Sequence, residues 1–403
     1  MDEHSKITPI GVTNYRSQKQ CFGIKDKDRL QHIYVIGKSG TGKSTLLENM
    51  AISDIERGIG CGIIDPHGDI ARDILNYIPE ERKSDLIYFN ATDSEHPIAF
   101  NPLHAVHPKY HHLVASGLIS TFKKIWAESW GPRLEYILRY CLLTLMEYPD
   151  ATLLDIQPLL TDMGFRNHVL LYVQNAASKS FWSKEFEKYS PQFRSEAISP
   201  ILNKVGLFLT SIPLRNIVGQ KTKGIRIQQV LDEGKILIVN LSKGEIGEDA
   251  SSLLGSILLT SIQLAAMHRA TQLEHIRKPF YLYVDEMHSF ISLSFVDVLA
   301  EARKYGLSLF LTHQYIEQID ERIRGAIFGN VGTIISFRVG AMDAEILEKE
   351  FYPIFNKEDF INLPRYNMYL KLMIDGTTSQ PFSANSLSLK GSSEVNNQDI
   401  SIG

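Results

Sequence analysis

Short runs of β-branched and aromatic residues alternate along the chain with segments in which apolar residues recur at helical spacing. The run HIYVIG (residues 32–37) is apolar and ends in glycine, and a helical pattern follows it over residues 42–57. Further apolar runs of strand length cover residues 61–65, 86–90, 235–241, 280–286, 307–313, 331–339 and 367–374. Strands that are buried on both faces are apolar throughout, so the pattern predicts an α/β fold on a mostly parallel sheet.

The stretch from about residue 104 to residue 215 breaks this alternation. It holds several helical patterns and no run with the character of a strand. In LEYILRYCLLTLME (residues 134–147) apolar residues recur every three or four positions, and Glu135 lies one helical turn before Arg139. The stretch therefore predicts an all-helical domain.

These patterns predict one α/β domain split by an insertion. Its first part covers residues 1–103, the helical insertion covers residues 104–215, and its second part covers residues 216–382. The end of the chain, residues 383–403, is rich in Ser, Asn and Gly, and we expect a disordered tail there.

Composition adds limits to this picture. Of the 403 residues 44% are hydrophobic and 22% are charged, which is typical of a soluble globular protein with a sizeable core. The formal net charge of −4 excludes a uniformly basic nucleic-acid coat but allows a local basic surface. Three widely spaced cysteines and no signal peptide favour a cytoplasmic location. The apolar stretch over residues 253–267 is shorter than the roughly 20 residues of a spanning helix, so we expect a buried helix.

The most specific motif is GKSGTGKST, which matches G-x-x-x-x-G-K-[ST] between a predicted strand and a predicted helix. Its members are Gly37, Lys38, Ser39, Gly40, Thr41, Gly42, Lys43, Ser44 and Thr45. Glycines let the backbone curl so that its N–H groups and the helix N-terminus face phosphate oxygens. Lys43 would contact the β- and γ-phosphates, Ser44 would bind Mg²⁺, and Thr45 would lie beside the α-phosphate.

Two later strands end in polar residues suited to hydrolysis. FYLYVDE ends in Asp285, a candidate Mg²⁺ ligand, and Glu286, which could polarise the attacking water. In LFLTHQY, Gln314 could sense the γ-phosphate. Two acids favour an enzyme that hydrolyses its nucleotide, and the lack of an NKxD-like signature favours ATP over GTP.

Two arginines are candidates for a group that stabilises the transition state from a neighbouring subunit. Arg303 lies in the predicted helix over residues 298–307, and Arg338 ends the strand pattern over residues 331–339. An exposed arginine is more often only a solvated charge, and the residues alone do not decide between the two.

Two further groups of polar residues are better explained by structural roles than by metal binding. Asp65, His67 and Asp69 follow a predicted strand, where capping or lining of the nucleotide crevice is favoured over a metal site. The histidines between residues 104 and 112 lack the cysteines and the spacing of a zinc site.

Taken in order, the GKSGTGKST segment (residues 37–45, the P-loop) and the IDPHGD, YLYVDE, ARKYGL and LTHQY segments resemble the HerA/FtsK superfamily of P-loop ATPases. Within it the chain is most similar to the coupling proteins of type IV secretion and conjugation (the TraG/TraD-like group), over roughly residues 20–380. The resemblance implies a RecA-like sheet, a hexameric ring and ATP-driven movement of DNA through a pore. It also implies that Arg303 is the trans-acting arginine and that the helical insertion recognises the relaxosome or other cargo.

The chain departs from this pattern in one respect. Many coupling proteins begin with transmembrane helices, whereas this chain starts about 30 residues before its first predicted strand. We therefore expect a cytoplasmic protein, peripheral at the inner face of the membrane and attached through a partner such as a secretion-channel protein. Lys221 and Lys223 are candidate pore residues that would contact DNA phosphates.

Two other functions stay open from the residues alone. The acidic net charge is compatible with an ATPase that acts on protein cargo. A nucleotide-gated, HerA-like scaffold for a partner nuclease would use the same motifs.

Overall fold

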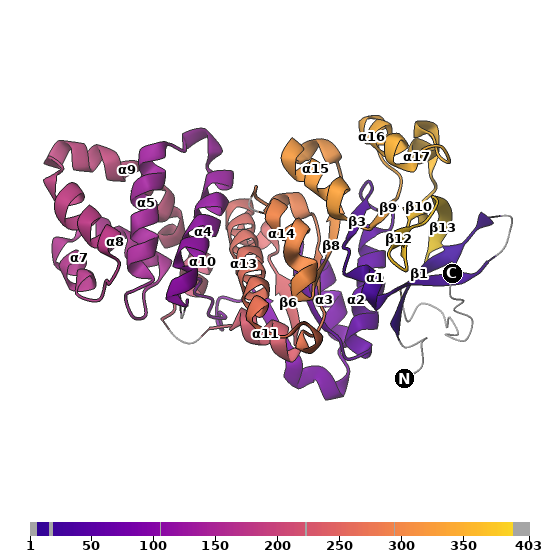
Figure 1. Ribbon diagram of the computed structural model, residues 1–403, viewed down its shortest axis with the longest axis horizontal. Coiled ribbons are helices and arrows are strands. Elements are labelled where there is room, and N and C mark those ends of the chain that lie inside the picture. The colour runs from indigo at the N-terminus through magenta and orange to yellow at the C-terminus, as the bar shows by residue number, and fades with distance from the viewer. Residues whose placement is uncertain (1–5, 16–18, 105, 222–223, 294, 390–403) are drawn as a thin grey trace. The chain divides into compact units, whose positions relative to one another are not determined.

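The computed structural model describes the chain except for residues 1–5, 16–18, 105, 222–223, 294 and 390–403 (Figure 1). The chain folds into two compact units, which are described one at a time. The first consists of Met1–Phe89, Gln228–Asn240 and Ala265–Gly403, and the second of Asn90–Ile227 and Leu241–Leu264. The second unit thus extends beyond the insertion expected at residues 104–215.

The first unit is built on an 11-stranded sheet. Its central strands, in spatial order, are β9 (Thr333–Ser336), β3 (Ile33–Ile36), β8 (Leu307–His313), β7 (Phe280–Val284), β4 (Gly60–Asp65), β6 (Ile236–Asn240) and β5 (Leu86–Asn90). All pairings from β9 to β6 are parallel. The α/β class with a mostly parallel core predicted from the apolar runs is confirmed.

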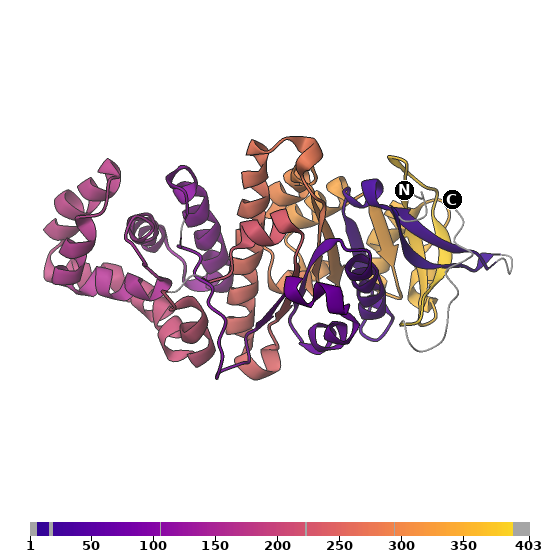
Figure 2. The same ribbon diagram turned by 90° about the horizontal axis from the view of Figure 1, so that it is seen from below.

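The other side of the sheet is antiparallel. Beyond β9 come β10 (Asn367–Lys371), β13 (Phe382–Ser386), β1 (Ile7–Thr13) and β2 (Cys21–Lys25), and β11 (Met373–Ile374) pairs separately with β12 (Thr377–Thr378). Figure 2 shows the β1–β2 ribbon in indigo beside these yellow strands.

The antiparallel side differs from the sequence prediction in three ways. The disordered tail expected from Ser383 onward is wrong for β13, which is hydrogen-bonded between β1 and β10. The strands β1 and β2 were not expected, and the run over residues 367–374 divides into two strands. Backbone pairing does not need apolar side chains, so the polar sequence FSANS forms a strand around one fully buried residue, Ala384. Residues 390–403 lie outside the described part.

Helix α2 (Lys43–Glu56) begins directly at the P-loop and packs against β1 and β4 (Figures 1 and 2). Its inner face is apolar, and Leu47, Met50 and Ala51 are completely buried. The other helices of this unit are α1 (Asp26–Arg29), α3 (Asp69–Ile74), α11 (Ile227–Glu233), α14 (Phe295–Glu301), α15 (Glu321–Asn330), α16 (Ala341–Phe351) and α17 (Lys357–Asn362).

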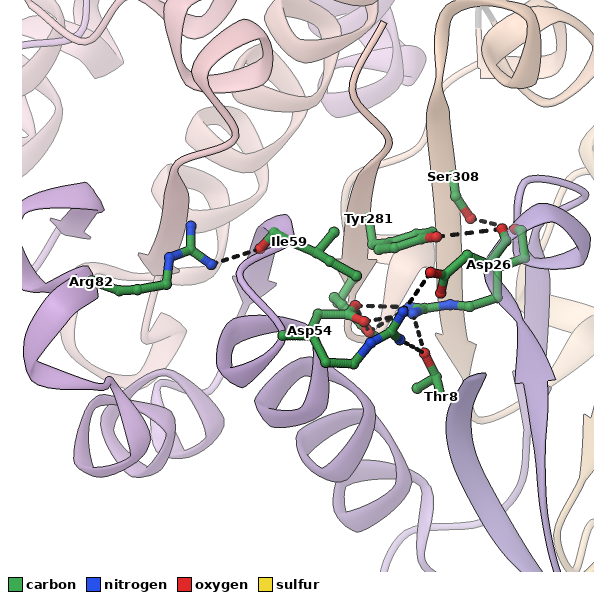
Figure 3. A network of polar contacts seen from close by, with 10 residues as sticks. Thr8, Asp26, Asp54, Ile59, Arg82, Tyr281 and Ser308 are labelled. Carbon is green, nitrogen blue, oxygen red and sulfur yellow. Dashed lines mark hydrogen bonds and ion pairs between the residues drawn. The ribbon is translucent and has the colours of Figure 1, made fainter. Parts of the chain in front are cut away.

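A buried ion pair fixes the far end of α2 to the sheet. Arg29 Nη1 lies 2.6 Å from Asp54 Oδ1, and both side chains are at most 1% exposed. The Tyr283 hydroxyl of β7 donates to Asp54 Oδ2 over 2.6 Å, and Arg29 Nη1 donates to Thr8 Oγ1 over 2.7 Å. Figure 3 shows Asp54 and Thr8 in this network, with the Tyr281 ring beside them. The network therefore ties the helix that begins at the P-loop to strands β1 and β7.

Beyond Asn90 the described residues of the second unit form helices joined by turns and loops, and none of them forms a strand. Its helices are α4 (His111–Ile125), α5 (Pro132–Leu145), α6 (Ile156–Thr161), α7 (Met163–Leu170), α8 (Ala176–Ser180), α9 (Pro191–Thr210), α10 (Ile212–Val218) and α12 (Lys243–Ile246). At its core Trp182 is fully buried, and its indole N–H donates to Thr144 Oγ1 over 2.7 Å.

Helix α13 (Glu248–His268) is longer than the 15 apolar residues predicted, and the division between the units falls within it. Together with the turn after it (Glu248–Thr271), it is the single candidate among the described residues for a helix that could cross a membrane by length and composition. The mean hydropathy of its most apolar window is 1.5, and 72% of that window is buried inside the protein, as in a core helix.

Candidate functional site

The parallel register brings the carboxyl ends of four strands to one edge of the sheet. Ile36 of β3 pairs with His313 of β8, and Val284 of β7 pairs with both Leu311 of β8 and Ile64 of β4. The residues that follow these strands therefore lie side by side, as expected for a ligand site in an open α/β sheet.

The P-loop backbone uses conformations that only glycine adopts readily. Gly40 has φ +70° and Gly42 has φ +125°, immediately before α2 begins. At Gly37 a Cβ atom would lie 2.6 Å from Phe337 Cβ, so the approach of this loop to its neighbour also requires glycine. These two features explain the spacing of glycines in the motif.

Hydrogen bonds hold the loop in place. The Thr41 hydroxyl donates to the Lys38 carbonyl over 2.7 Å, and the Lys38 N–H donates to the Arg338 carbonyl over 2.8 Å. Ser44 is exposed in the first turn of α2, and Thr45 is half-buried.

Lys43 points back into the loop. Its side-chain Nζ donates to the Gly37 carbonyl over 2.6 Å and to the Lys38 carbonyl over 3.2 Å. Burial lowers the pKa of Lys43, while Glu286 and Asp285 oppose that effect. A phosphate oxygen that took the place of these carbonyls would offer a stronger, charge-assisted bond, so the residue fits a polyphosphate ligand.

Asp285 lies at the end of β7 with a side chain that is 4% exposed. Burial raises its pKa to about 6, and the Thr312 hydroxyl opposes this by donating to Asp285 Oδ1 over 2.5 Å. A carboxylate and the Ser44 hydroxyl are the hard oxygen ligands that Mg²⁺ prefers, usually together with phosphate oxygens and water. The residues present therefore fit Mg²⁺ bound with a nucleotide.

Glu286 is held from three directions. Its backbone has φ +45°, an uncommon conformation for this residue type, and its N–H donates to Thr312 Oγ1 over 3.1 Å. The Gln314 side-chain amide donates to Glu286 Oε1 over 2.5 Å, and His288 Nδ1 lies 3.4 Å from Glu286 Oε2. The structure thus brings Glu286 and Gln314 together, beside Asp285.

Arg303 is not part of this cluster. It is exposed in the 3₁₀ turn Ala302–Tyr305 just before β8, where its Nη1 donates to Gln31 Oε1 over 2.7 Å. Gln31 precedes β3, so both residues lie at the amino ends of these strands, opposite the P-loop. Arg338 is half-buried, and its backbone carbonyl contacts the P-loop of its own chain.

Sequence reasoning missed two residues at the acidic side of the site. Thr312, near the end of β8 and two residues before Gln314, hydrogen-bonds both Asp285 and Glu286. Glu48 is 8% exposed, and burial together with Asp73 and Asp65 raises its pKa to about 7. It lies one helical turn after Ser44, a spacing that would have indicated it.

Asp65 serves as a cap. Its carboxylate accepts from the backbone N–H groups of His67 over 2.8 Å and of Ala71 over 3.0 Å. Among the residues that the structure describes, no group of three or more His, Cys, Asp or Glu side chains could hold a metal ion by itself.

The fold resembles that of solved proteins. The bacterial conjugative coupling protein TrwBdeltaN70, in its unbound monoclinic form, superposes with a TM-score of 0.67 at 16% identity, covering 91% of this chain and 86% of that one. Plasmid coupling protein TrwB in complex with a non-hydrolysable ATP analogue gives a TM-score of 0.64 at 16% identity, covering 90% and 86%. VirB4 of Thermoanaerobacter pseudethanolicus gives 0.65 at 13% identity, covering 94% and 96%.

No curated protein sequence matches the chain. A family model does: that of the type IV secretion-system coupling protein DNA-binding domain matches residues 22–345. The matched region includes the P-loop, Asp285, Glu286, Arg303 and Gln314. The chain therefore belongs to the family of type IV secretion-system coupling protein DNA-binding domains.

Proposed function

We propose that the protein is an ATP-hydrolysing motor that binds and translocates DNA in conjugative or type IV secretion transfer. The observation that carries this proposal is the convergence of the P-loop, Asp285 and the hydrogen-bonded pair Glu286–Gln314 at one edge of the sheet. Family membership supports DNA as the partner.

The residues divide the chemistry among them. Lys43 and the P-loop N–H groups bind the phosphates. Ser44 and Asp285 would hold Mg²⁺, which would neutralise charge on the phosphate oxygens. Glu286 orients the attacking water and accepts its proton. Because Gln314 donates to Glu286, loss of the γ-phosphate and movement at the end of β8 would be coupled.

A homo-oligomeric ring, with six subunits as the family resemblance implies, would complete the site. Arg303 lies at the strand edge opposite its own P-loop, so it could reach a nucleotide only from a neighbouring subunit. This placement supports Arg303 as the trans-acting group, and Arg338 is the competing candidate.

We place the DNA contacts on exposed basic side chains of the second unit. Lys221 is exposed there, whereas Lys223 lies outside the described residues. The relaxosome or secretion-channel proteins would be further partners, and attachment at the cytoplasmic face of the membrane would run through one of them.

Steady-state ATP turnover with and without DNA tests the function. The wild-type protein should hydrolyse ATP with Mg²⁺ and accelerate when single- or double-stranded DNA is added, and Lys43→Ala should abolish both rates. Lys278→Ala, at an exposed lysine outside the site, is the matched control and should leave both rates unchanged. Turnover that responds to a protein partner and ignores DNA would favour action on protein cargo and contradict the proposal.

A further inference from the structure

Tyr366 lies on the side of the P-loop away from the hydrolytic residues. The strands β8 and β7, which lead to Gln314 and Glu286, lie on one side of β3, whereas β9 and β10 lie on the other. A nucleotide whose γ-phosphate faced Glu286 would extend from there across the start of α2, which would bring its base to the β9–β10 side. Tyr366 directly precedes β10.

The ring of Tyr366 lies against the P-loop. The Tyr366 backbone N–H donates to the Thr41 carbonyl over 2.9 Å. A Cβ atom on Gly42 would lie 3.2 Å from Tyr366 Cδ1, so the aromatic ring reaches the last glycine of the loop. The residue is nonetheless 53% exposed, which leaves part of the ring open to a ligand.

The surrounding structure forces Tyr366 into this position. Its φ is +63°, a left-handed conformation that is costly for an aromatic residue. Two backbone hydrogen bonds maintain it: the bond to Thr41, and one of 2.8 Å from the Ser386 N–H to the Tyr366 carbonyl. Strain of this kind persists only where neighbouring contacts over-determine the backbone, and it clusters at ligand sites.

The chain after β13 is fixed on the same side. The Asn49 side-chain amide, one helical turn after Thr45, donates to the carbonyls of Leu387 and Ser388, each over 3.2 Å. Because Ser386 also holds Tyr366, this segment connects α2 to the tyrosine. The backbone of Tyr366 is thereby tied to the helix that also carries Thr45.

We propose that Tyr366 stacks on the purine base of the bound nucleotide and so supplies the base subsite of the ATP site. The inference rests on the proposed ATP binding. An aromatic ring of this kind attracts a nucleobase through its π-face and excludes water from one side of it.

Binding of Mg²⁺–ATP and of Mg²⁺–tripolyphosphate, which lacks a base, tests this role. Tyr366→Asn removes the ring but keeps a residue type that tolerates positive φ, and it should weaken ATP binding roughly 10-fold or more. Tripolyphosphate binding should not change. Tyr366→Phe should bind both ligands like the wild type, as should Tyr172→Asn, a control at an exposed tyrosine of the second unit.

A Tyr366→Trp variant gives a direct optical signal. Its fluorescence should be quenched by ATP and not by tripolyphosphate, because only ATP brings a base onto the indole ring.

Four results would overturn the inference. Equal weakening of both ligands in Tyr366→Asn would show that the ring supports the P-loop and does not contact the base. Wild-type-like ATP binding in that variant would show that the ring does not contact the base. A wild-type protein that binds tripolyphosphate as tightly as ATP would show that no base subsite exists, while leaving the P-loop intact. A wild-type protein that binds neither ligand would contradict the proposed function itself, and the inference with it.

Discussion

The Gln314 side-chain amide donates to Glu286 Oε1 over 2.5 Å, which links the ends of strands β8 and β7. The bond fixes the carboxylate of Glu286 at the edge of the sheet where the P-loop also lies. Since Glu286 is only 4% exposed, its orientation depends on such partners.

Glu286→Gln should separate nucleotide binding from hydrolysis. The variant keeps the shape of the side chain but cannot accept a proton, so we expect turnover to fall about 100-fold or more. ATP affinity should stay close to that of the wild type, as measured by equilibrium binding. Gln314→Ala should lower turnover less, because it leaves Glu286 in place but releases its carboxylate. If Glu286→Gln hydrolysed ATP at the wild-type rate, another residue would have to be the general base.

Thr312→Val should weaken Mg²⁺-dependent nucleotide binding. The valine keeps the shape but loses the hydroxyl that donates to Asp285, so the pKa of Asp285 should rise further above about 6. Loss of a partner that orients a metal ligand typically costs about 10- to 100-fold in metal affinity. A Mg²⁺ titration at fixed ADP measures the effect, and Thr312→Ser is the control that retains the hydroxyl. If ADP binding depended on Mg²⁺ equally in Thr312→Val and Thr312→Ser, the role of the hydrogen bond from Thr312 to Asp285 would be contradicted.

Asp54→Ala should be strongly destabilising. It leaves the guanidinium of Arg29 buried without its partner, and breaking a buried ion pair in this way costs about 3–5 kcal/mol in the free energy of unfolding. Urea unfolding measures the loss. The double variant Arg29→Met/Asp54→Leu should recover much of it, because no buried charge is then left alone. A double variant as unstable as Asp54→Ala would show that the polar contacts themselves are needed.

His32 should make stability fall in mild acid. Burial lowers its pKa from 6.5 to about 4, and its Nδ1 accepts from the Leu309 N–H over 3.1 Å. His32 is therefore protonated near pH 6.5 in the unfolded chain but only near pH 4 in the folded protein. Stability is lost as the pH falls between these values, by at most roughly 1.4 kcal/mol per pH unit from this group.

Urea unfolding at several pH values checks this prediction. His32→Asn, which suits the positive φ of that position, should show a shallower pH dependence between pH 6.5 and pH 4. An unchanged slope would mean that His32 is not the titrating group.

Mixed subunits test the trans-acting arginine. Arg303→Ala and Glu286→Gln should each be inactive alone, but mixing them should restore part of the activity. Some interfaces would then pair an intact Glu286 with an intact Arg303 from the neighbour. The role of Arg303 would be contradicted if its mixtures recovered no activity at any ratio. Recovery in mixtures of Arg338→Ala with Glu286→Gln would then assign the role to Arg338.

The central fold was predictable because each of its strands is recognisable from its own apolar sequence. Buried parallel strands are apolar along their whole length, and the glycine pattern after β3 marks the P-loop whatever the distant sequence is. The same logic placed Asp285 and Gln314 at one edge, since parallel strands end together.

The remaining features depend on contacts between distant residues. β13 is rich in Ser and Asn and is a strand because β1 and β10 flank it. The Tyr283–Asp54 bond joins residues 229 positions apart, which no local pattern indicates. Tyr366 directly precedes β10, and only the fold brings it to Thr41.

ATP-coupled movement along DNA is the most direct test of the proposed motor. Displacement of streptavidin from the biotinylated end of single- and double-stranded DNA reports that movement. The wild-type protein should displace streptavidin from at least one substrate with ATP and Mg²⁺, and not with a non-hydrolysable analogue. Lys43→Ala and Glu286→Gln should fail under all conditions. DNA-stimulated ATP turnover without displacement from either substrate would contradict translocation as the function.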